Sequence, residues 1–311
     1  MNADQLHVVA ARANPLRWKT PERIYRDWVE HMLDSGVKLT VVECQYGERE
    51  FTAALPHVNH IGVRASSWCW AKENLLNIGF GRLPEARYLC WSDSDVFHRR
   101  SDWAVETLHA LQNYHIVQPW AEAYDLGPDR EISQTHISFC KVLHQGGPVV
   151  PEGKNFWKYD GGPYQYPHSG YVWAATRQAI DWLGGLLEIG GMGSGDHHMA
   201  LALAGQAERS MPGQTSAAYR RHVMRWQSRA LQHINGNIGY VPISIEHRFH
   251  GKKSDRGYVS RWGMFVEHLF DPDEDLKKNA CGVIEWAGNK PDLRRQFDLY
   301  LRSRNEDANT I

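Results

Sequence analysis

The chain has 311 residues, with 35 Lys and Arg against 36 Asp and Glu, so its formal net charge is −1. A hydrophobic share of 42% is that of an ordinary folded protein of one or two domains, which excludes a wholly disordered or fibrous chain. The balanced charge removes the simplest argument for a dedicated nucleic-acid binder.

Three features predict a cytoplasmic protein with no membrane contact. No apolar run approaches the ~20 residues needed to cross a bilayer, and the first residues, MNADQ, lack the basic and then apolar pattern of a signal peptide. The 5 cysteines are odd in number and scattered, which favours free thiols in a reducing compartment.

Strands and helices are expected to alternate along the first hundred residues. The apolar run at 7–12 predicts a buried strand, Thr20-Pro21 predicts the capped start of a helix, and Gly36 is placed to end it. This order of elements predicts a parallel sheet with right-handed crossovers. The further elements expected here are strands at 37–43, 61–64 and 87–92 and a helix at 68–79.

The remaining residues continue the pattern around a long interruption. The region 121–169 is rich in Gly, Pro, His and aromatic residues and is predicted to form functional loops. The expected strands lie at 115–120 and 170–176, a further apolar run covers 238–245, and helices are expected at 101–113, at 177–187, from Asp196 and at 292–304.

Two carboxylates, Asp93 and Asp95, follow the predicted strand at 87–92. Ligands of open α/β sheets bind at the carboxyl ends of parallel strands, and two hard oxygen donors there can hold Mg²⁺ or Mn²⁺ against a diphosphate. The alternative is an exposed acidic turn.

A second pair, His247 and His250, follows the apolar run at 238–245. Two imidazoles at this spacing can reach one metal ion, and imidazole suits Mn²⁺ or Zn²⁺ better than Mg²⁺. Two surface histidines among basic neighbours are the alternative.

A glycine-rich stretch, 190–195, leads into Asp196 at the start of a predicted helix. Glycines permit a mobile loop, and a carboxylate held toward a substrate can act as a base. Asp196 could equally be a helix N-cap. The stretch lacks the Gly-Lys-Ser/Thr of a P-loop and the GxGxxG spacing of a dinucleotide site.

Positive charge gathers in the segment 218–261, which holds nine Lys and Arg against two acidic residues, a net of +7. This segment predicts contact with phosphate, either of a nucleotide diphosphate or of a nucleic-acid backbone. Lys252, Lys253 and Arg256 are the expected phosphate contacts, and a solvated basic surface is the alternative.

Three blocks resemble the β-1,4-galactosyltransferase family and occur in its order. Residues 67–96, SWCWAKENLLNIGFGRLPEARYLCWSDSDV, resemble its AK-LLN-GF helix and the following strand that ends in DxD. Residues 193–203, GSGDHHMALAL, are similar to its glycine and acidic stretch, and residues 247–253, HRFHGKK, resemble its metal-binding histidine and basic run. The same blocks also resemble uncharacterised glycosyltransferase-like proteins of phages and bacteria.

The resemblance implies an α/β GT-A fold and an inverting, metal-dependent transfer of sugar from a nucleotide-diphosphate sugar. It implies one domain at 1–285, with a nucleotide-sugar-binding half at about 1–100 and an acceptor half at 101–285, followed by a C-terminal helix and polar tail at 286–311. Carried over by position, the expected roles are metal ligation by Asp95 and His250, with His247 at the place of a methionine ligand; donor contact by Arg12, Glu43 and Asp93; and catalytic base for Asp196.

The expected cofactors are Mn²⁺ or Mg²⁺ and a nucleotide-sugar donor, with UDP as the favoured nucleotide. Met192 stands where the family has a sugar-packing tryptophan, which leaves the sugar and the acceptor open. A glycan, a small molecule and a hydroxymethylated pyrimidine in phage DNA remain as acceptors. A metal-dependent hydrolase of sugar nucleotides or phosphoesters and a non-catalytic nucleotide-sugar binder are the alternative functions.

Overall fold

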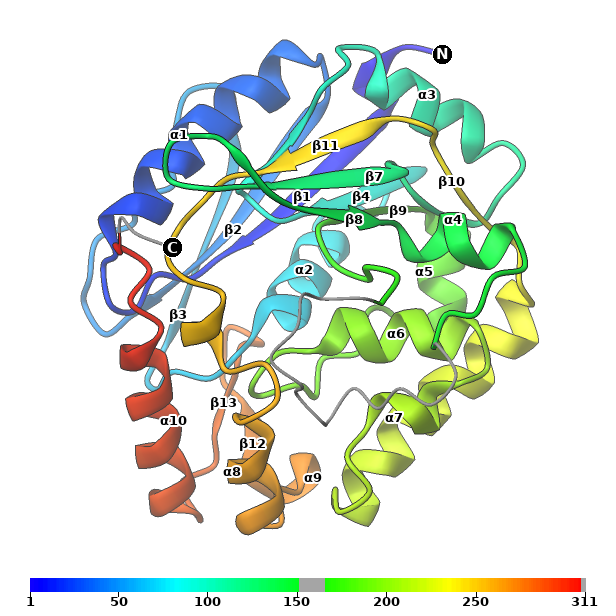
Figure 1. Cartoon of the computed structure of the whole chain (residues 1–311). Helices are drawn as coiled ribbons and strands as arrows, with labels where there is room; N and C mark the ends of the chain where they lie inside the picture. The colour runs from blue at the N-terminus through cyan, green and yellow to red at the C-terminus, as the bar shows by residue number, and fades with distance from the viewer. Residues whose placement is uncertain (151–165, 309–311) are drawn as a thin grey trace.

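A seven-stranded sheet forms the centre of the molecule in the computed structural model, which describes residues 1–150 and 166–308 (Figure 1). Its strand order is β10-β6-β9-β4-β1-β2-β3, and β9 runs antiparallel to both of its neighbours while the other pairs are parallel. The strands are β1 (Leu6–Arg12), β2 (Lys38–Tyr46), β3 (Asn59–Ala65), β4 (Tyr88–Ser92), β6 (Ile116–Gln118), β9 (Val172–Thr176) and β10 (Ile238–Tyr240).

A second sheet, of order β5-β11-β7-β8, continues from the first. Its strands β5, β7 and β11 each start four positions after a main-sheet strand ends, so three chain segments pass from one sheet into the other. The strands are β5 (Val96–His98), β7 (Glu122–Leu126), β8 (Ile132–Ile137) and β11 (Ser244–His247), and a separate hairpin joins β12 (Leu276–Lys278) to β13 (Ile284–Trp286).

Helices cover both faces of the main sheet because its strands alternate buried apolar side chains between two cores. In β1, Val8 and Ala10 belong to one core and Val9 to the other. The first core includes α1 (Lys19–Asp34) and α3 (Trp103–Ala110). The second includes α2 (Lys72–Gly81), α4 (Phe139–His144), α5 (Arg177–Leu183), α6 (Gly195–Leu203), α7 (Ala217–Arg229), α8 (Trp262–Glu267) and α10 (Pro291–Ser303), and the short α9 (Pro272–Asp275) lies near α7.

The predicted fold class, α/β with a mostly parallel central sheet flanked by helices, is confirmed. The expected strands at 7–12, 37–43, 61–64 and 87–92 correspond to β1 to β4, and the expected C-terminal helix corresponds to α10. Within the described ranges, none of the helices is long and apolar enough to cross a membrane.

Two expectations are wrong in detail, those for the region 121–169 and for the start of α1, and two further features depend on strand pairing that the sequence analysis did not address. The region 121–169 holds β7, β8 and α4 in place of continuous loops, although 151–165 lies outside the described residues. The run at 238–245 is split between β10 and β11 in different sheets, and β9 is not parallel to its neighbours. Finally, α1 begins at Lys19, and Trp18, not Thr20, is its N-cap residue.

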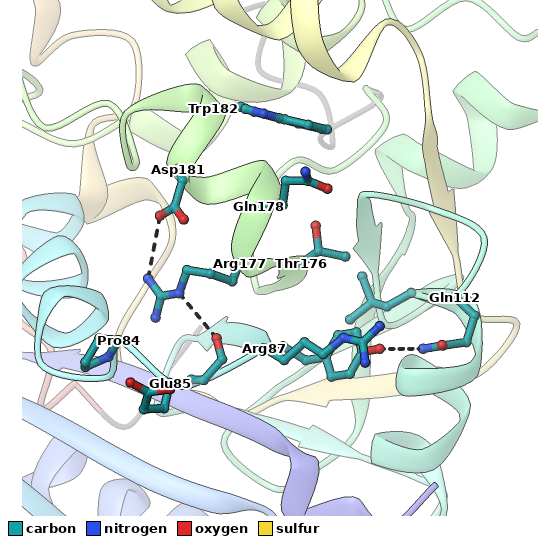
Figure 2. Close-up of a pocket in the computed structure, with 12 residues that line it drawn as sticks. Pro84, Glu85, Arg87, Gln112, Thr176, Arg177, Gln178, Asp181 and Trp182 are labelled. Atoms are coloured by element: carbon teal, nitrogen blue, oxygen red, sulfur yellow. Dashed lines mark hydrogen bonds and ion pairs between the residues drawn. The ribbon is translucent and has the colours of Figure 1, made fainter.

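A pocket of about 600 Å³ opens at the amino edge of the main sheet, beside the start of β4 and the start of α5 (Figure 2). Arg177 bonds to the backbone carbonyl of Ala86 and lies 3.9 Å from Asp181, and Gln112 donates to the hydroxyl of Tyr88 at 2.9 Å. These polar groups therefore tie the first turn of α5 and the end of α3 to the sheet.

The close packing of α2 on β1 and β2 depends on Gly79. A Cβ at this position would lie 2.6 Å from Cγ1 of Val9 and 2.9 Å from Cγ2 of Val42. We expect Gly79→Ala to lower the free energy of unfolding by roughly 1–3 kcal/mol, because the helix must move off the sheet.

Gly81 in the same helix is the matched control, because a Cβ there meets nothing within 4 Å. Gly81→Ala should raise the free energy of unfolding by up to about 1 kcal/mol, as alanine is the better helix former. Urea unfolding of the two variants measures the difference, and equal stability would contradict this account of the packing.

Candidate functional site

The candidate site lies at the carboxyl edge of the main sheet, where β4 passes into β5. Asp93 and Asp95 occupy the turn between these strands, so the sheet fixes both ends of the acidic segment. The antiparallel pairing of β5 with β11 places Val96 opposite His247, and the backbone N–H of Arg248 donates to the carbonyl of Asp95 at 2.9 Å. The register of two strands far apart in sequence thus brings His247 next to Asp95.

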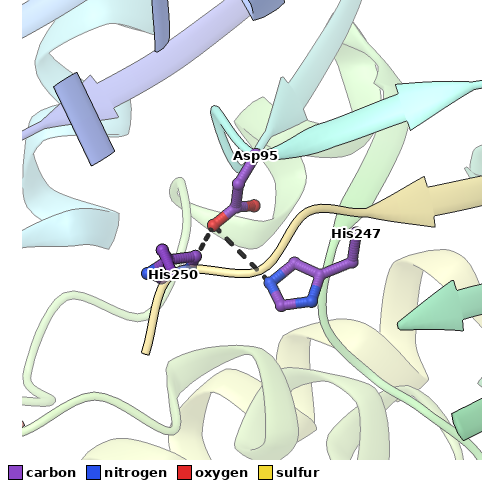
Figure 3. A group of neighbouring side chains, drawn as sticks. All are labelled: Asp95, His247 and His250. Carbon is purple, nitrogen blue, oxygen red and sulfur yellow. Dashed lines mark ion pairs between the residues drawn. The ribbon is translucent and has the colours of Figure 1, made fainter. Parts of the chain in front are cut away.

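Asp95, His247 and His250 form a compact cluster of side chains (Figure 3). Oδ2 of Asp95 lies 2.7 Å from Nε2 of His250 and 3.6 Å from Nε2 of His247, and one donor atom from each residue lies within 4.8 Å of the others. Oδ1 of Asp95 is buried with no hydrogen-bond partner. One carboxylate and two imidazoles with an unsatisfied buried oxygen are a donor set that fits a divalent transition metal such as Mn²⁺.

Asp125, which the sequence analysis missed, holds His247 in place. It lies opposite His247 in the parallel pair β7–β11, and its Oδ1 is 2.8 Å from Nδ1 of His247. The same buried carboxylate accepts from the hydroxyl of Tyr171 at 2.7 Å, lies 2.5 Å from Nε2 of His136 and pairs with Lys253. A carboxylate behind a metal-binding histidine fixes the ring and raises its basicity.

The charges of this cluster follow from these contacts. Burial alone would lower the pKa of His247, but Asp95 and Asp125 outweigh it and raise the pKa to about 9. Burial would raise the pKa of Asp125, but His136 and His247 hold it far below its usual range. Asp95, whose pKa His247 and His250 lower against the effect of burial, and Asp125 are therefore ionised at neutral pH. A metal ion bound here would have to displace the proton that His247 holds between them.

Asp196 occupies the first turn of α6, and Glu73 lies close to the same turn. Gly170 lies directly against this carboxylate, since a Cβ there would lie 2.9 Å from Oδ2 of Asp196. A Cβ at position 195 would lie 2.5 Å from Oε1 of Glu73. Burial raises the pKa of Glu73 to about 7, with the charge of Lys72 opposing the shift and that of Asp196 adding to it.

Lys72 is a second residue that the sequence analysis missed. Its ammonium forms an ion pair with Asp93, and the charges of Asp93 and Asp196 raise its pKa against the effect of burial. Lys72 thus links the acidic turn after β4 electrostatically to the start of α6. Its place at the start of α2, within the block AKENLLN, was the only signal in the sequence.

Arg12 and Glu43 lie opposite each other in the register of β1 and β2, along the same edge as Asp93. Arg12 forms an ion pair with Glu22 and stacks on Tyr25, 4.0 Å from its ring centre. The carboxylate of Glu43 is buried and accepts from the backbone N–H groups of residues 52 and 53 at 2.8 and 2.9 Å, and from Gln45 and His60. Both side chains therefore bond to residues other than Asp95, His247 and His250.

The basic loop after β11, residues 248–256, lies against the metal-site cluster. Nη2 of Arg256 lies 3.0 Å from Nε2 of His250, while Nε of Arg256 is buried without a partner. Lys253 reaches Asp125, and Lys252 is partly exposed on the same loop. The remaining arginines of the basic segment lie mostly on α7, so the segment does not form one basic face.

The glycine-rich loop before α6 packs against Trp70. The backbone N–H of Trp70 donates to the carbonyl of Gly191 at 2.9 Å, and Gly193 has φ of +96° with the ring of Trp70 beside it. Arg261 donates to the hydroxyl of Ser194 at 2.6 Å. Met192 is buried in the core, and the aromatic ring that lies against this loop belongs to Trp70.

Comparison with known proteins leaves the family open. No protein-family model matches the chain, and no curated protein matches it in sequence. Among solved structures, the catalytic domain of Drosophila β1,4-galactosyltransferase 7 in complex with xylobiose has 12% identity and a TM-score of 0.33 over 65% of this chain and 61% of that chain, which is less than two thirds of its length.

Two further structures are similar at the same level. A glycosyltransferase involved in the glycosylation of the major capsid of PBCV-1 has 9% identity and a TM-score of 0.32 over 85% of this chain and 98% of that one. HddC from Yersinia pseudotuberculosis has 10% identity and a TM-score of 0.30 over 57% and 78%. Such low values carry no argument about activity, which has to come from the site itself.

We expect Asp125→Asn to weaken Mn²⁺ binding about 10–100-fold, the usual loss when the carboxylate behind a ligating histidine is removed. Titration calorimetry with MnCl₂ measures the affinity, and Asp95→Asn should abolish binding. Tyr171→Phe is the matched control, because it removes one hydrogen bond to Asp125 and leaves the carboxylate. Unchanged Mn²⁺ affinity in Asp95→Asn would exclude the cluster as a metal site.

Proposed function

We propose that this protein is a metal-dependent glycosyltransferase that moves a sugar from a nucleotide-diphosphate sugar to an acceptor hydroxyl. The observation that carries the proposal is the Asp95, His247 and His250 cluster at the carboxyl edge of the sheet, with its unsatisfied buried oxygen. Lys72 connects this cluster through Asp93 to Asp196. The sequence resemblance to β-1,4-galactosyltransferases supports the same assignment.

In the proposed reaction, Asp95, His247 and His250 hold Mn²⁺ or Mg²⁺. A cation held by these residues would offset the negative charge that develops on the leaving diphosphate. Arg256, Lys253 and Lys252 lie on the adjoining loop, where their side chains can bind phosphate oxygens. Asp93, Arg12 and Glu43 line the neighbouring strand ends and are the proposed contacts to the rest of the donor.

Asp196 is the proposed catalytic base. Its carboxylate takes the proton from the acceptor hydroxyl as that oxygen bonds to the anomeric carbon, and the bond from this carbon to the diphosphate oxygen breaks. Attack from the face opposite the leaving group inverts the configuration. The adjoining glycine-rich loop and Trp70 can exclude water, which would otherwise hydrolyse the donor.

UDP is the proposed donor nucleotide, and the acceptor class stays open. A hydroxymethylated pyrimidine in DNA remains a prediction, although the basic segment that motivated it is divided in space. Arg220 and Arg221 of α7 pair with Glu208 and Asp273, and Arg248 pairs with Asp27. Salt-dependent binding to DNA would support this acceptor, and binding that does not vary with salt would count against it.

We expect Asp196→Asn to keep donor binding and to lose most transfer, about 10²–10⁴-fold, because the amide cannot accept the proton. Calorimetry with UDP and MnCl₂ tests donor binding, and product formation tests transfer. Asp181→Asn is the control, since this exposed carboxylate lies at the amino edge of the sheet. Unchanged transfer in Asp196→Asn would remove this residue as the base.

Incubation with Mn²⁺ and a panel of nucleotide sugars, with and without acceptors, separates the functions. Slow donor hydrolysis that an acceptor accelerates identifies a transferase. Fast turnover independent of any acceptor identifies a hydrolase, and binding without turnover identifies a nucleotide-sugar binder. Either of the last two results would overturn the proposal.

A further inference from the structure

The segment that follows α10 crosses the candidate site and returns to the start of α1, at the far end of the sequence. In Figure 1 the red segment after α10 leaves the top of that helix and reaches the start of α1. We call residues 304–308 the C-terminal strap. It packs on the turn that carries His250, since a Cβ at Gly251 would lie 2.7 Å from the carbonyl oxygen of Asn305.

Glu306 of the strap lies among the cations of the site. Its Oε2 is 3.6 Å from Nδ1 of His250, and its Oε1 accepts from Arg304 at 2.7 Å. Burial would raise the pKa of Glu306, but His250, Arg304 and Arg256 lower it to about 2. A fully ionised carboxylate therefore lies directly beside one of the three metal-binding candidates.

Asp307, the next residue, occupies the amino end of α1. Its two carboxylate oxygens accept from the backbone N–H groups of Lys19 and Thr20 at 3.0 and 2.7 Å. Trp18, the N-cap residue, supplies no side-chain cap of its own. The exposed N–H groups of a helix amino end bind carboxylate and phosphate oxygens by the same contacts.

Polar contacts hold the strap in place, and another anion can form the same hydrogen bonds and ion pairs. The last core side chain of α10 is Leu301, and the strap residues 305–308 read Asn, Glu, Asp and Ala, with no large apolar group. Arg304 covers Trp70, with its guanidinium 5.0 Å from the ring centre. The strap thus covers a cation cluster, a helix amino end and an aromatic ring at once.

From this arrangement we infer that His250, Arg256 and the amino end of α1 form an anion-binding cradle for a diphosphate, which the carboxylates of Glu306 and Asp307 occupy until a ligand displaces them. Carboxylate and phosphate oxygens accept the same hydrogen bonds from arginine, imidazole and backbone N–H groups. The inference rests on the proposed function for its natural ligand. It adds that the strap blocks the donor site of the free protein. The apparent affinity for a diphosphate is then the intrinsic affinity multiplied by the fraction of molecules in which the strap is displaced.

The test uses inorganic pyrophosphate with MnCl₂ as the probe. In the wild-type protein, hydrogen exchange at the backbone amides of the strap, such as that of Ala308, which donates to the carbonyl of Asn305, should become faster when pyrophosphate is added, because the strap leaves the cradle. The N–H groups of Lys19 and Thr20 then pass from Asp307 to the pyrophosphate. In calorimetry, the double variant E306Q/D307N should bind pyrophosphate about tenfold more tightly or better, since nothing competes for the cradle.

The control variant E85Q/E274Q removes two exposed carboxylates elsewhere and changes the net charge by the same amount. It should bind pyrophosphate as the wild type does. Slower or unchanged exchange at the strap amides, or equal or weaker binding by E306Q/D307N than by the control, would overturn the inference. The exchange measurement decides the question even if the double variant does not fold.

The outcomes also separate this inference from the proposed function. Strap displacement by pyrophosphate without turnover of any nucleotide sugar would retain the cradle and reject the transferase. Sugar transfer with the strap in place throughout would retain the transferase and reject the cradle.

Discussion

The passage of three chain segments from the main sheet into the second sheet is the constraint on which the site depends. The chain leaves β4, β6 and β10 and enters β5, β7 and β11 after three intervening residues each time. Adjacent corners are hydrogen-bonded to each other, as the backbone N–H of Ala121 donates to the carbonyl of Ile243 at 2.7 Å. Asp95 lies in one corner, while Asp125 and His247 lie on strands that leave the other two.

This geometry explains why a carboxylate can be buried at the site. Asp125 lies in the second sheet, and its oxygens meet donors from β8, from Tyr171 just before β9 and from the loop after β11, as well as from His247. A buried ionised carboxylate without such partners would cost far more than the roughly 2–7 kcal/mol of a neutral polar group that lacks its hydrogen bonds. The register of the second sheet therefore decides both which side chains form the metal-site candidate and which groups balance the charge of Asp125.

The local sequence predicts the parts of the site that depend on single segments. A strand followed by Asp93 and Asp95, and an apolar run followed by His247 and His250, can each be recognised within about ten residues, and the structure brings Asp95 and both histidines together. Asp125 could not be found in this way, because its role depends on the register between β7 and β11. The same holds for Lys72, whose partner Asp93 belongs to another element.

The fold, too, has parts that local sequence predicts and parts that depend on long-range strand pairing. Helix α10 and strands β1 to β4 follow from periodicity, whereas the antiparallel direction of β9 and the splitting of the run at 238–245 follow from long-range pairing. The balanced net charge likewise conceals local structure, because basic residues near the site pair with acids from elsewhere in the chain, as Lys253 pairs with Asp125 and Lys72 with Asp93.

The capping of α1 by Asp307 has a consequence for how the protein folds during synthesis. Helix α1 connects β1 to β2 and is among the first elements made, yet the acceptor for its free N–H groups is 288 residues further along the chain. Its first turn therefore lacks this partner, and remains prone to fraying, until residue 307 has left the ribosome. The first turn of α1 and Asp307 therefore gain their mutual hydrogen bonds only late in synthesis, at the edge of the candidate site.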